Sequence, residues 1–255
     1  MKLNIAKIAF AALILPASLG LLSCESEDEN PTSESETQAS LKATATQSSS
    51  GTSENGRFTI SGFTVNEFTV GTQDVAMKYY ASADLVGGID LGGIQLKTTL
   101  NAELQTSSSE RKSLNLVSNG ETKVSLVGQG NTPEGNYKQV SFSLYSNETS
   151  SDPMYQKSLF ITGEINGKST QFWTETEKVI EATSESASGI EVENNTELLL
   201  SFEMEKLFAG VDFSNAIDAN NDGKIEIRPN SPDGNAELLA KIEANLESSV
   251  VLKKR

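Results

Sequence analysis

One short segment carries residues whose types and spacing suit a bound metal ion. Residues 218–226 read Asp-Ala-Asn-Asn-Asp-Gly-Lys-Ile-Glu, which matches the first nine positions of an EF-hand-like calcium loop. In such a loop alternate oxygen donors point inward, a glycine takes the sharp turn and an apolar residue anchors the loop on the core. The predicted donors are Asp218, Asn220, Asp222, the carbonyl group of Lys224, and Glu226. Calcium is the one cofactor that the sequence predicts.

The match to a calcium loop ends before the loop is complete. Pro229 stands at the twelfth position, where a bidentate glutamate should complete the shell of ligands. Asp212 or Asp233 is a replacement if the fold brings either one close. The alternative is a turn rich in Asp and Asn that leads into a short strand at 224–227, because these residues favour turns with no ion present. An ion in this loop would be structural rather than catalytic.

Other chemistry is limited by the scarcity of reactive side chains. The chain of 255 residues has no histidine and one cysteine, which excludes a His-centred triad, a His-ligated metal, a CxxC redox pair and an internal disulfide. Its net charge of −15 repels nucleic acid at long range. A hydrolase that works through two carboxylates stays open, and so does a protein without catalysis.

The N-terminal residues have the pattern of an export signal. Lys2 and Lys7 precede an apolar run at 8–22, which is too short and too interrupted for a membrane-spanning helix. The tetrad Leu-Leu-Ser-Cys at 21–24 resembles the lipobox of bacterial lipoproteins, in which the peptide is cut before the cysteine and the thiol is acylated. The resemblance implies a signal peptide at 1–23 and a lipid on Cys24. The alternative is an ordinary secretory signal followed by an incidental free cysteine.

Residues 24–56 have the composition of a flexible, acidic stalk. They are largely Ser, Thr, Glu, Gln and Ala, and they cannot bury enough apolar area to offset the entropy of ordering. The acidic cluster at 25–29 resembles the export signal of surface-displayed lipoproteins in some Gram-negative bacteria. It implies an outer-membrane lipoprotein at the cell surface rather than on the periplasmic face. The alternative is that these acids simply solubilise the stalk.

From residue 57 onward the pattern changes to short strands separated by turns. Segments such as Phe58-Thr59-Ile60 alternate apolar residues with threonine, which is typical of half-buried strands. Asn119-Gly120 and Asn166-Gly167 supply the positive φ angles of tight hairpin turns. Further strands are expected at 75–80, 94–104, 122–127, 137–145, 158–165, 170–180 and 197–204. The sequence therefore predicts a mainly β domain at 57–255, an antiparallel β-sandwich of about seven to eight strands.

A C-terminal amphipathic helix is expected at 235–251. Apolar residues recur there at steps of three and four and form one face, with Asp233 or Asn235 as the cap. We expect this helix to pack on the sandwich as a lid. A membrane or partner helix is the alternative, but the body of the helix lacks the basic residues of a membrane-surface helix.

The single tryptophan gives the sequence one candidate contact for a sugar. Trp173 follows Phe172 in an expected strand, so the two rings face opposite sides of the sheet. One ring is expected in the core. An exposed Trp173 would suit stacking on a sugar, whereas packing in the core or at an edge is the more common arrangement.

Two short motifs resemble a group of bacterial β-sandwich lipoproteins classed as domains of unknown function. One is the turn Pro-Glu-Gly-Asn-Tyr at 133–137, which opens a long core strand in that group, and the other is the tail at 207–213. The resemblance supplies no catalytic residues. The lipid anchor, the long stalk and the lack of catalytic residues favour a non-catalytic binding or adhesion module held on the membrane, with an unidentified glycan or protein as its ligand. The alternatives are a carboxylate-dependent hydrolase and a structural component of an envelope assembly.

Overall fold

The computed structural model describes residues 36–47, 58–80 and 109–255. The predicted signal peptide at 1–23, Cys24, most of the predicted stalk and the strand expected at 94–104 lie outside these residues. The described residues belong to one unit, which spans 34–255 and has its own hydrophobic core. This unit therefore contains the buried apolar surface that it needs to fold by itself.

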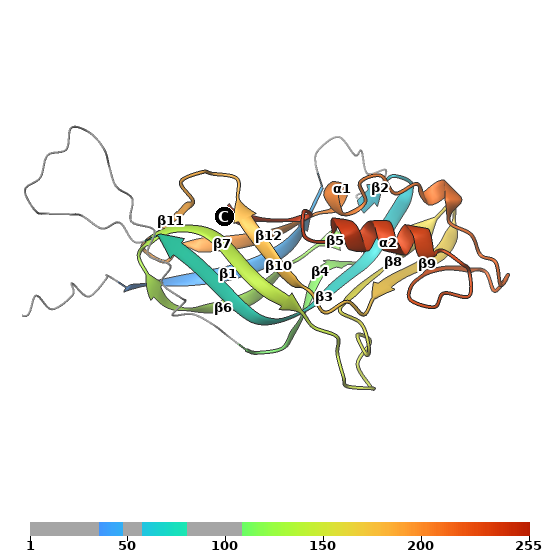
Figure 1. Ribbon diagram of the computed structural model, residues 1–255, viewed down its shortest axis with the longest axis horizontal. Coiled ribbons are helices and arrows are strands. Elements are labelled where there is room, and N and C mark those ends of the chain that lie inside the picture. Colours follow the sequence, from blue (N-terminus) through green and yellow to red (C-terminus); the bar gives the residue numbers. More distant parts are fainter. Residues whose placement is uncertain (1–35, 48–57, 81–108) are drawn as a thin grey trace, which may run out of the picture. The chain divides into compact units, whose positions relative to one another are not determined.

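Strands make up most of the described structure, and helices are few (Figure 1). The elements are β1 (Glu36–Thr46), β2 (Phe58–Ile60), β3 (Phe63–Tyr80), β4 (Lys112–Ser118), β5 (Glu121–Thr122), β6 (Val124–Pro133), β7 (Gly135–Leu144), β8 (Leu159–Ile165), β9 (Lys168–Thr174), β10 (Val179–Ser184), β11 (Ile190–Val192), β12 (Glu197–Glu203), α1 (Met204–Leu207), η2 (Phe213–Asn215), β13 (Lys224–Ile227), α2 (Ala236–Asn245) and β14 (Val250–Lys254). The prediction of a mainly β fold is confirmed. In this part of the chain no helix has the length and apolar character needed to cross a bilayer.

The described strands form one mixed sheet of 14 strands. The longest path through it runs β13-β9-β8-β3-β7-β10-β14-β12-β1-β6. The pairs β1–β12, β10–β14 and β13–β9 are parallel, and the other pairs are antiparallel. The predicted antiparallel sandwich of seven to eight strands is therefore corrected in strand number and in strand direction. Parallel pairs join segments that are distant in the sequence, and local periodicity carries no information about them.

Strand β1 comes from the segment that the sequence predicts to be a stalk. One edge of β1 pairs in parallel with β12, and the other edge pairs antiparallel with β6. Its buried side chains alternate along the strand at Ala39, Leu41, Ala43 and Ala45. The prediction of disorder is therefore wrong for residues 36–46, because two remote strands supply the contacts that the segment's own composition lacks.

Strand β3 is 18 residues long and links β8 to β7 in the sheet. Its first half pairs with β8 and its second half with β7, so β8 and β7 follow one another along the same edge. The loop that joins β7 to β8 begins and ends beside Gly71 of β3. The Gly71 backbone N–H donates to the Ser158 carbonyl (2.8 Å), and the Gly71 carbonyl accepts from the Tyr145 backbone N–H (3.0 Å). A Cβ on Gly71 would lie 2.1 Å from the Tyr145 carbonyl oxygen. Only glycine permits this close approach.

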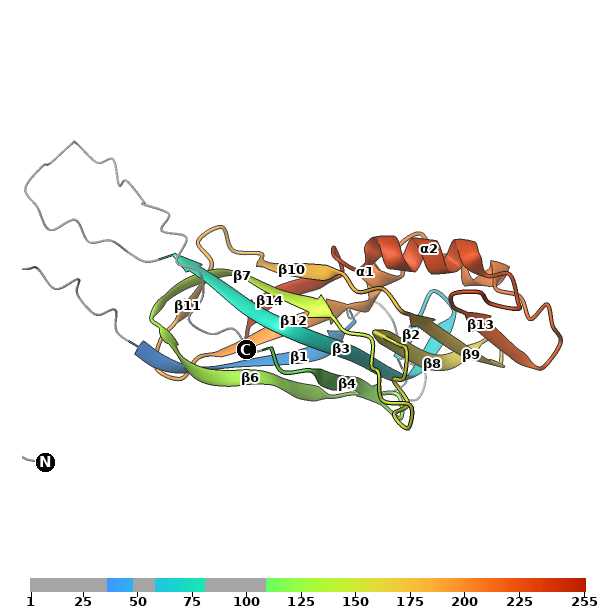
Figure 2. The same cartoon turned by 60° about the horizontal axis from the view of Figure 1, so that its bottom comes forward.

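The sheet curls so that β6, the last strand of the path, returns to β4. Strand β4 pairs with β3, and it also contacts β6, because the Ser125 hydroxyl donates to the Asn115 carbonyl (2.6 Å). Both views of the ribbon place β4 and β6 side by side (Figures 1 and 2). Four strands, β1, β3, β4 and β6, therefore approach one another around a common interior.

A cluster of phenylalanine rings fills part of the core. The ring centroid of Phe63 lies 5.7 Å from that of Phe208 and 5.3 Å from that of Phe213. The rings of Phe208 and Phe213 are 5.2 Å apart, and all three side chains are buried. The two latter residues belong to the tail at 207–213, so this motif contributes to packing.

Both predicted Asn-Gly hairpins are confirmed. Asn119 and Gly120 have φ angles of 54° and 78° and join β4 to β5. Asn166 and Gly167 have φ angles of 51° and 75° and join β8 to β9. These turns depend on the local backbone preferences of two residues, which is why sequence alone places them correctly.

The C-terminal segment forms a helix and then a strand. Helix α2 buries Leu238 and Ile242, and it packs against β9 and β13. Asn235 stands at the cap position, but its side chain makes no capping hydrogen bond. The residues after the helix form β14 between β10 and β12. The helix predicted at 235–251 is therefore too long, because the apolar spacing continues into the strand-forming pair Val250-Val251.

Candidate functional site

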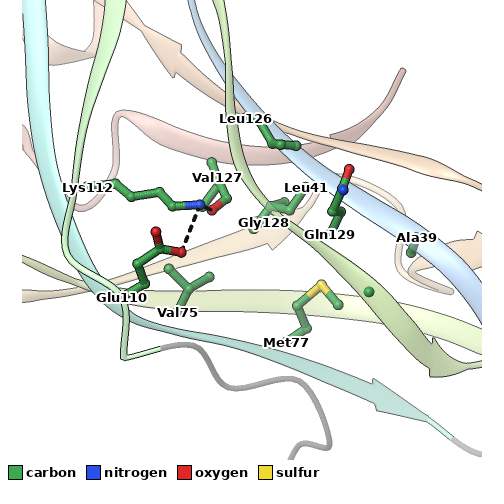
Figure 3. Close-up of a pocket in the computed structure, with 11 residues that line it drawn as sticks. Ala39, Leu41, Val75, Met77, Glu110, Lys112, Leu126, Val127, Gly128 and Gln129 are labelled. Atoms are coloured by element: carbon green, nitrogen blue, oxygen red, sulfur yellow. Dashed lines mark hydrogen bonds and ion pairs between the residues drawn. The ribbon is translucent and has the colours of Figure 1, made fainter.

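A pocket of about 320 Å³ opens between β1, β3, β4 and β6 (Figure 3). This volume lies at the lower end of the range for small-molecule sites. The lining residues are Ala39 and Leu41 on β1, Val75 and Met77 on β3, Glu110 and Lys112 at the start of β4, and residues 126–130 on β6. Most of the wall is aliphatic, and the charged groups are confined to the β4 side (Figure 3).

The pocket exists because glycine occupies two inward positions of β6 where this strand pairs with β1. Leu41 of β1 faces Gly128 of β6, and Ala39 faces Gly130. Directly opposite residues of an antiparallel pair share one face of the sheet, and Ala39 and Leu41 are both buried. The two glycines therefore lie on the inner face without side chains. A Cβ built on Gly128 meets no atom within 4 Å, so the space beside it is open.

Lys112 brings a charge to the wall of the pocket. Its ammonium group donates to the Val127 carbonyl (2.9 Å) and pairs with the Glu110 carboxylate (3.1 Å). Figure 3 shows the lysine side chain reaching from β4 toward β6, with Glu110 beside its tip. The side chain of Lys112 is 27% exposed and that of Glu110 is 65% exposed. Lysine is therefore the deeper and more constrained partner of this ion pair.

Sequence reasoning missed this site entirely. The signal that was available is the spacing Gly128-Gln129-Gly130, two glycines at alternate positions of a strand. Glycine inside a strand indicates a bulge or a close approach, and here it marks an empty position on the inner face. To infer the empty position, one needs the register in which β6 pairs with β1, and the sequence predicts disorder for the β1 segment.

The predicted calcium loop folds as a tight turn closed by its own hydrogen bonds. The Asp218 carboxylate accepts from the backbone N–H groups of Asp222 and Gly223, both at 3.1 Å. Asn220 Oδ1 also accepts from the Asp222 N–H (3.0 Å), and Asp222 Oδ1 accepts from the Lys224 N–H (2.9 Å). The structure thus brings Asp218, Asn220 and Asp222 together around one turn.

The other predicted ligands are directed to other partners. The Glu226 carboxylate pairs with Arg228 (3.2 Å), and Asp212 accepts from the Ser214 backbone N–H (3.0 Å) at the start of η2. Within the described ranges, no group of three or more acidic or cysteine side chains is arranged to hold a metal. The side-chain donors that meet in this turn are two carboxylates and one amide. They do not form a complete set of calcium ligands, so calcium binding stays a prediction.

The carboxyl group of Asp218 has a lowered pKa. Burial raises the pKa of its carboxyl group, but the Lys168 ammonium group (3.2 Å) and the two backbone N–H groups outweigh burial. The pKa of Asp218 therefore lies below its ordinary value, and the carboxylate is ionised at neutral pH. Lys168 competes with any metal cation for this carboxylate.

Asp233 anchors the loop to the sheet. Its side chain is fully buried, and its carboxylate accepts from the backbone N–H groups of Ala219 (3.1 Å) and Glu226 (2.7 Å). The first contact holds the turn and the second holds β13. Its carboxylate oxygens therefore accept from backbone donors, although the sequence predicts Asp233 as a replacement metal ligand.

Comparisons with known proteins give no match. No protein-family model, curated protein or solved structure matches the chain. The resemblance to β-sandwich lipoproteins therefore stays a prediction, and function must be argued from the geometry of the chain itself.

Trp173 is half-buried and its ring is engaged by two cations. Phe172 is fully buried, as expected for one of the two neighbouring rings. The Arg228 guanidinium carbon lies 4.9 Å from the Trp173 ring centroid, and the Lys157 ammonium nitrogen lies 5.5 Å from it. Cation–π contacts of this kind are attractive where they are sheltered from water. The ring of Trp173 already contacts two charged side chains, and this arrangement does not favour stacking on a sugar.

Proposed function

We propose that this chain is a membrane-anchored envelope lipoprotein whose β domain binds a small apolar ligand without catalysis. The observation that carries the proposal is the pocket between β1, β3, β4 and β6. An open space lined by aliphatic side chains leaves apolar surface in contact with water, and burial of such surface is favourable. A bound ligand covers this surface, and the few polar groups on one wall can orient it.

The anchor in this proposal is a lipid on Cys24, which holds the chain at the outer membrane and displays it at the cell surface. Strand β1 begins at Glu36, twelve residues after Cys24. A chain of that length spans at most about 40 Å, from roughly 3.3–3.6 Å per residue.

The anchor is tested in cells that express the full chain. We expect wild-type protein to incorporate labelled palmitate and to fractionate with the outer membrane, and Cys24→Ala to lose both properties. Protease added to intact cells should degrade the wild-type domain if it is displayed at the surface. Protection of the domain until the outer membrane is opened would place it on the periplasmic face instead.

The pocket is tested with the soluble chain from residue 25 onward and decanol, by isothermal titration calorimetry. We expect decanol to bind the wild type and not to bind Gly128→Val, which places a side chain in the open space. Asn131→Val is the matched control, because this exposed position lies on the same strand outside the lining. Equal signals from both variants would contradict binding in the pocket.

The carboxylate-dependent hydrolase has less support from this pocket. Such an enzyme needs two acids that converge in one cleft. Among the described residues that line the pocket, Glu110 is the only acid, and it is paired with Lys112. A glycan or protein ligand on the outer surface, or a structural role in an envelope assembly, remains the alternative to a small ligand.

A further inference from the structure

We infer that the pocket takes an amphipathic carboxylate, with a flexible aliphatic chain in the apolar space and a carboxylate group on Lys112. This inference rests on the proposed function and names the class of ligand for the same pocket. It uses three properties of the wall, namely its aliphatic surface, the position of its lysine and the exposure of its glutamate.

The surface of the wall suits an aliphatic chain better than a ring. Leu41, Val75 and Val127 present branched aliphatic groups, and Met77 adds an unbranched thioether that adapts to irregular shapes. None of the described lining residues is aromatic. A planar aromatic ligand would therefore find no ring on which to stack, whereas a flexible chain can follow the space left by Gly128 and Gly130.

Lys112 is placed to hold the polar end of such a ligand. It is the only cation among the described lining residues, and the Val127 carbonyl fixes the direction of its ammonium group. An ammonium group has three donors, so one hydrogen bond to Val127 leaves donors for a carboxylate. A hydrogen bond between two charged groups is roughly twice as strong as a neutral one.

Glu110 shows that a carboxylate fits against this lysine. Its carboxylate lies 3.1 Å from the ammonium nitrogen, at the place where the ligand's carboxylate would bind. The side chain is 65% exposed, and exposed ion pairs contribute little to stability. A ligand carboxylate can therefore compete with Glu110 for this contact.

A cationic ligand fits the same wall poorly. It would pair with Glu110 while lying against the ammonium group of Lys112, which the Val127 carbonyl holds in place. The acidic chain repels an anion at long range, so added salt should speed the association of a carboxylate by screening this repulsion. Repulsion in solution affects the rate of encounter, and the local contact with Lys112 decides which head group is held.

The test compares decanoate with decanol on the soluble chain from residue 25 onward, by isothermal titration calorimetry. We expect Lys112→Met to weaken decanoate about tenfold, the loss expected for one hydrogen bond between charged groups, and to leave decanol unchanged. Glu110→Gln should strengthen decanoate about threefold by removing the internal competitor. Lys123→Met is the matched control, because it removes the same charge from an exposed side chain outside the pocket.

The possible failures of the two proposals are distinguishable. If Lys112→Met and Lys123→Met bind decanoate equally well while Gly128→Val still blocks it, the carboxylate contact is overturned and binding in the pocket stands. If the wild type binds neither decanoate nor decanol, both proposals fail. Melting temperatures of all variants are measured alongside, and Glu110→Gln, which removes only an exposed carboxylate, tests the contact even if Lys112→Met does not fold.

Discussion

Replacement of Asp233 by alanine should destabilise the protein far more than the same replacement at a comparable exposed aspartate. The Asp233 carboxylate is fully buried and accepts backbone hydrogen bonds at 2.7 and 3.1 Å, from Glu226 and Ala219. A hydrogen bond to a charged group contributes about 1.5–3 kcal/mol, and the removal of the acceptor also leaves the backbone N–H groups of Ala219, Asn220 and Glu226 without this partner. Ala219 and Asn220 are exposed, so water can satisfy part of what is lost. We therefore expect Asp233→Ala to lower the free energy of unfolding by about 3 kcal/mol.

The assay is urea unfolding of the soluble chain, followed by the fluorescence of Trp173, the only tryptophan of the chain. Asp212→Ala is the control, because the Asp212 carboxylate also accepts from a backbone N–H, at Ser214 (3.0 Å), but on an exposed side chain. The transition of Asp233→Ala should move to clearly lower urea with an unchanged slope. Similar midpoints for the two variants would refute the reasoning, because burial would then add nothing to the value of the carboxylate.

Three further predictions follow from the same structure. Because the pKa of Asp218 is lowered in the folded state, the stability that it contributes should persist from neutral pH down to about pH 4 and be lost on further acidification; in urea unfolding at a series of pH values, Asp218→Asn should lose part of this acid dependence. If calcium binds the loop, millimolar calcium should raise the wild-type melting temperature above its value in chelator, and Asp222→Ala should abolish the difference; equal wild-type melts would leave the loop as a turn closed by its own hydrogen bonds. Gly71→Ala should unfold at much lower urea than wild type, because its Cβ would lie 2.1 Å from the Tyr145 carbonyl oxygen, whereas Gly128→Ala, which meets open space, should be neutral or stabilising.

Features that depend on a few neighbouring residues could be predicted from the sequence. The Asn-Gly hairpins are such features, and so is the alternation at the start of β3, where Phe63 and Val65 are fully buried. The turn at 218–224 is another, because Asp, Asn and Gly at these spacings close it by local hydrogen bonds. In each case the physical cause lies within a few residues of the chain.

Features that depend on distant partners could not be predicted. Strand β1 buries alanines rather than large apolar groups, so its own composition indicates disorder until β12 and β6 pair with it. The pocket follows from residues without side chains, and their position on the inner face is set by the register between Leu41 and Gly128. Lys112 and Asp233 acquire their roles from Val127 and Glu226, which are contacts that no local pattern encodes.

The position of β1 also determines how the protein would respond to mechanical force. If Cys24 carries the lipid, any pull between the membrane and a bound partner enters the folded unit through Glu36, at the start of β1. Strand β1 lies between β12 and β6 and is hydrogen-bonded along both edges. Force along its axis loads those two ladders in shear, so many hydrogen bonds must break together instead of one after another. The lipid tether would thus end in an element that resists extraction, and the β domain could carry load while its pocket remains intact.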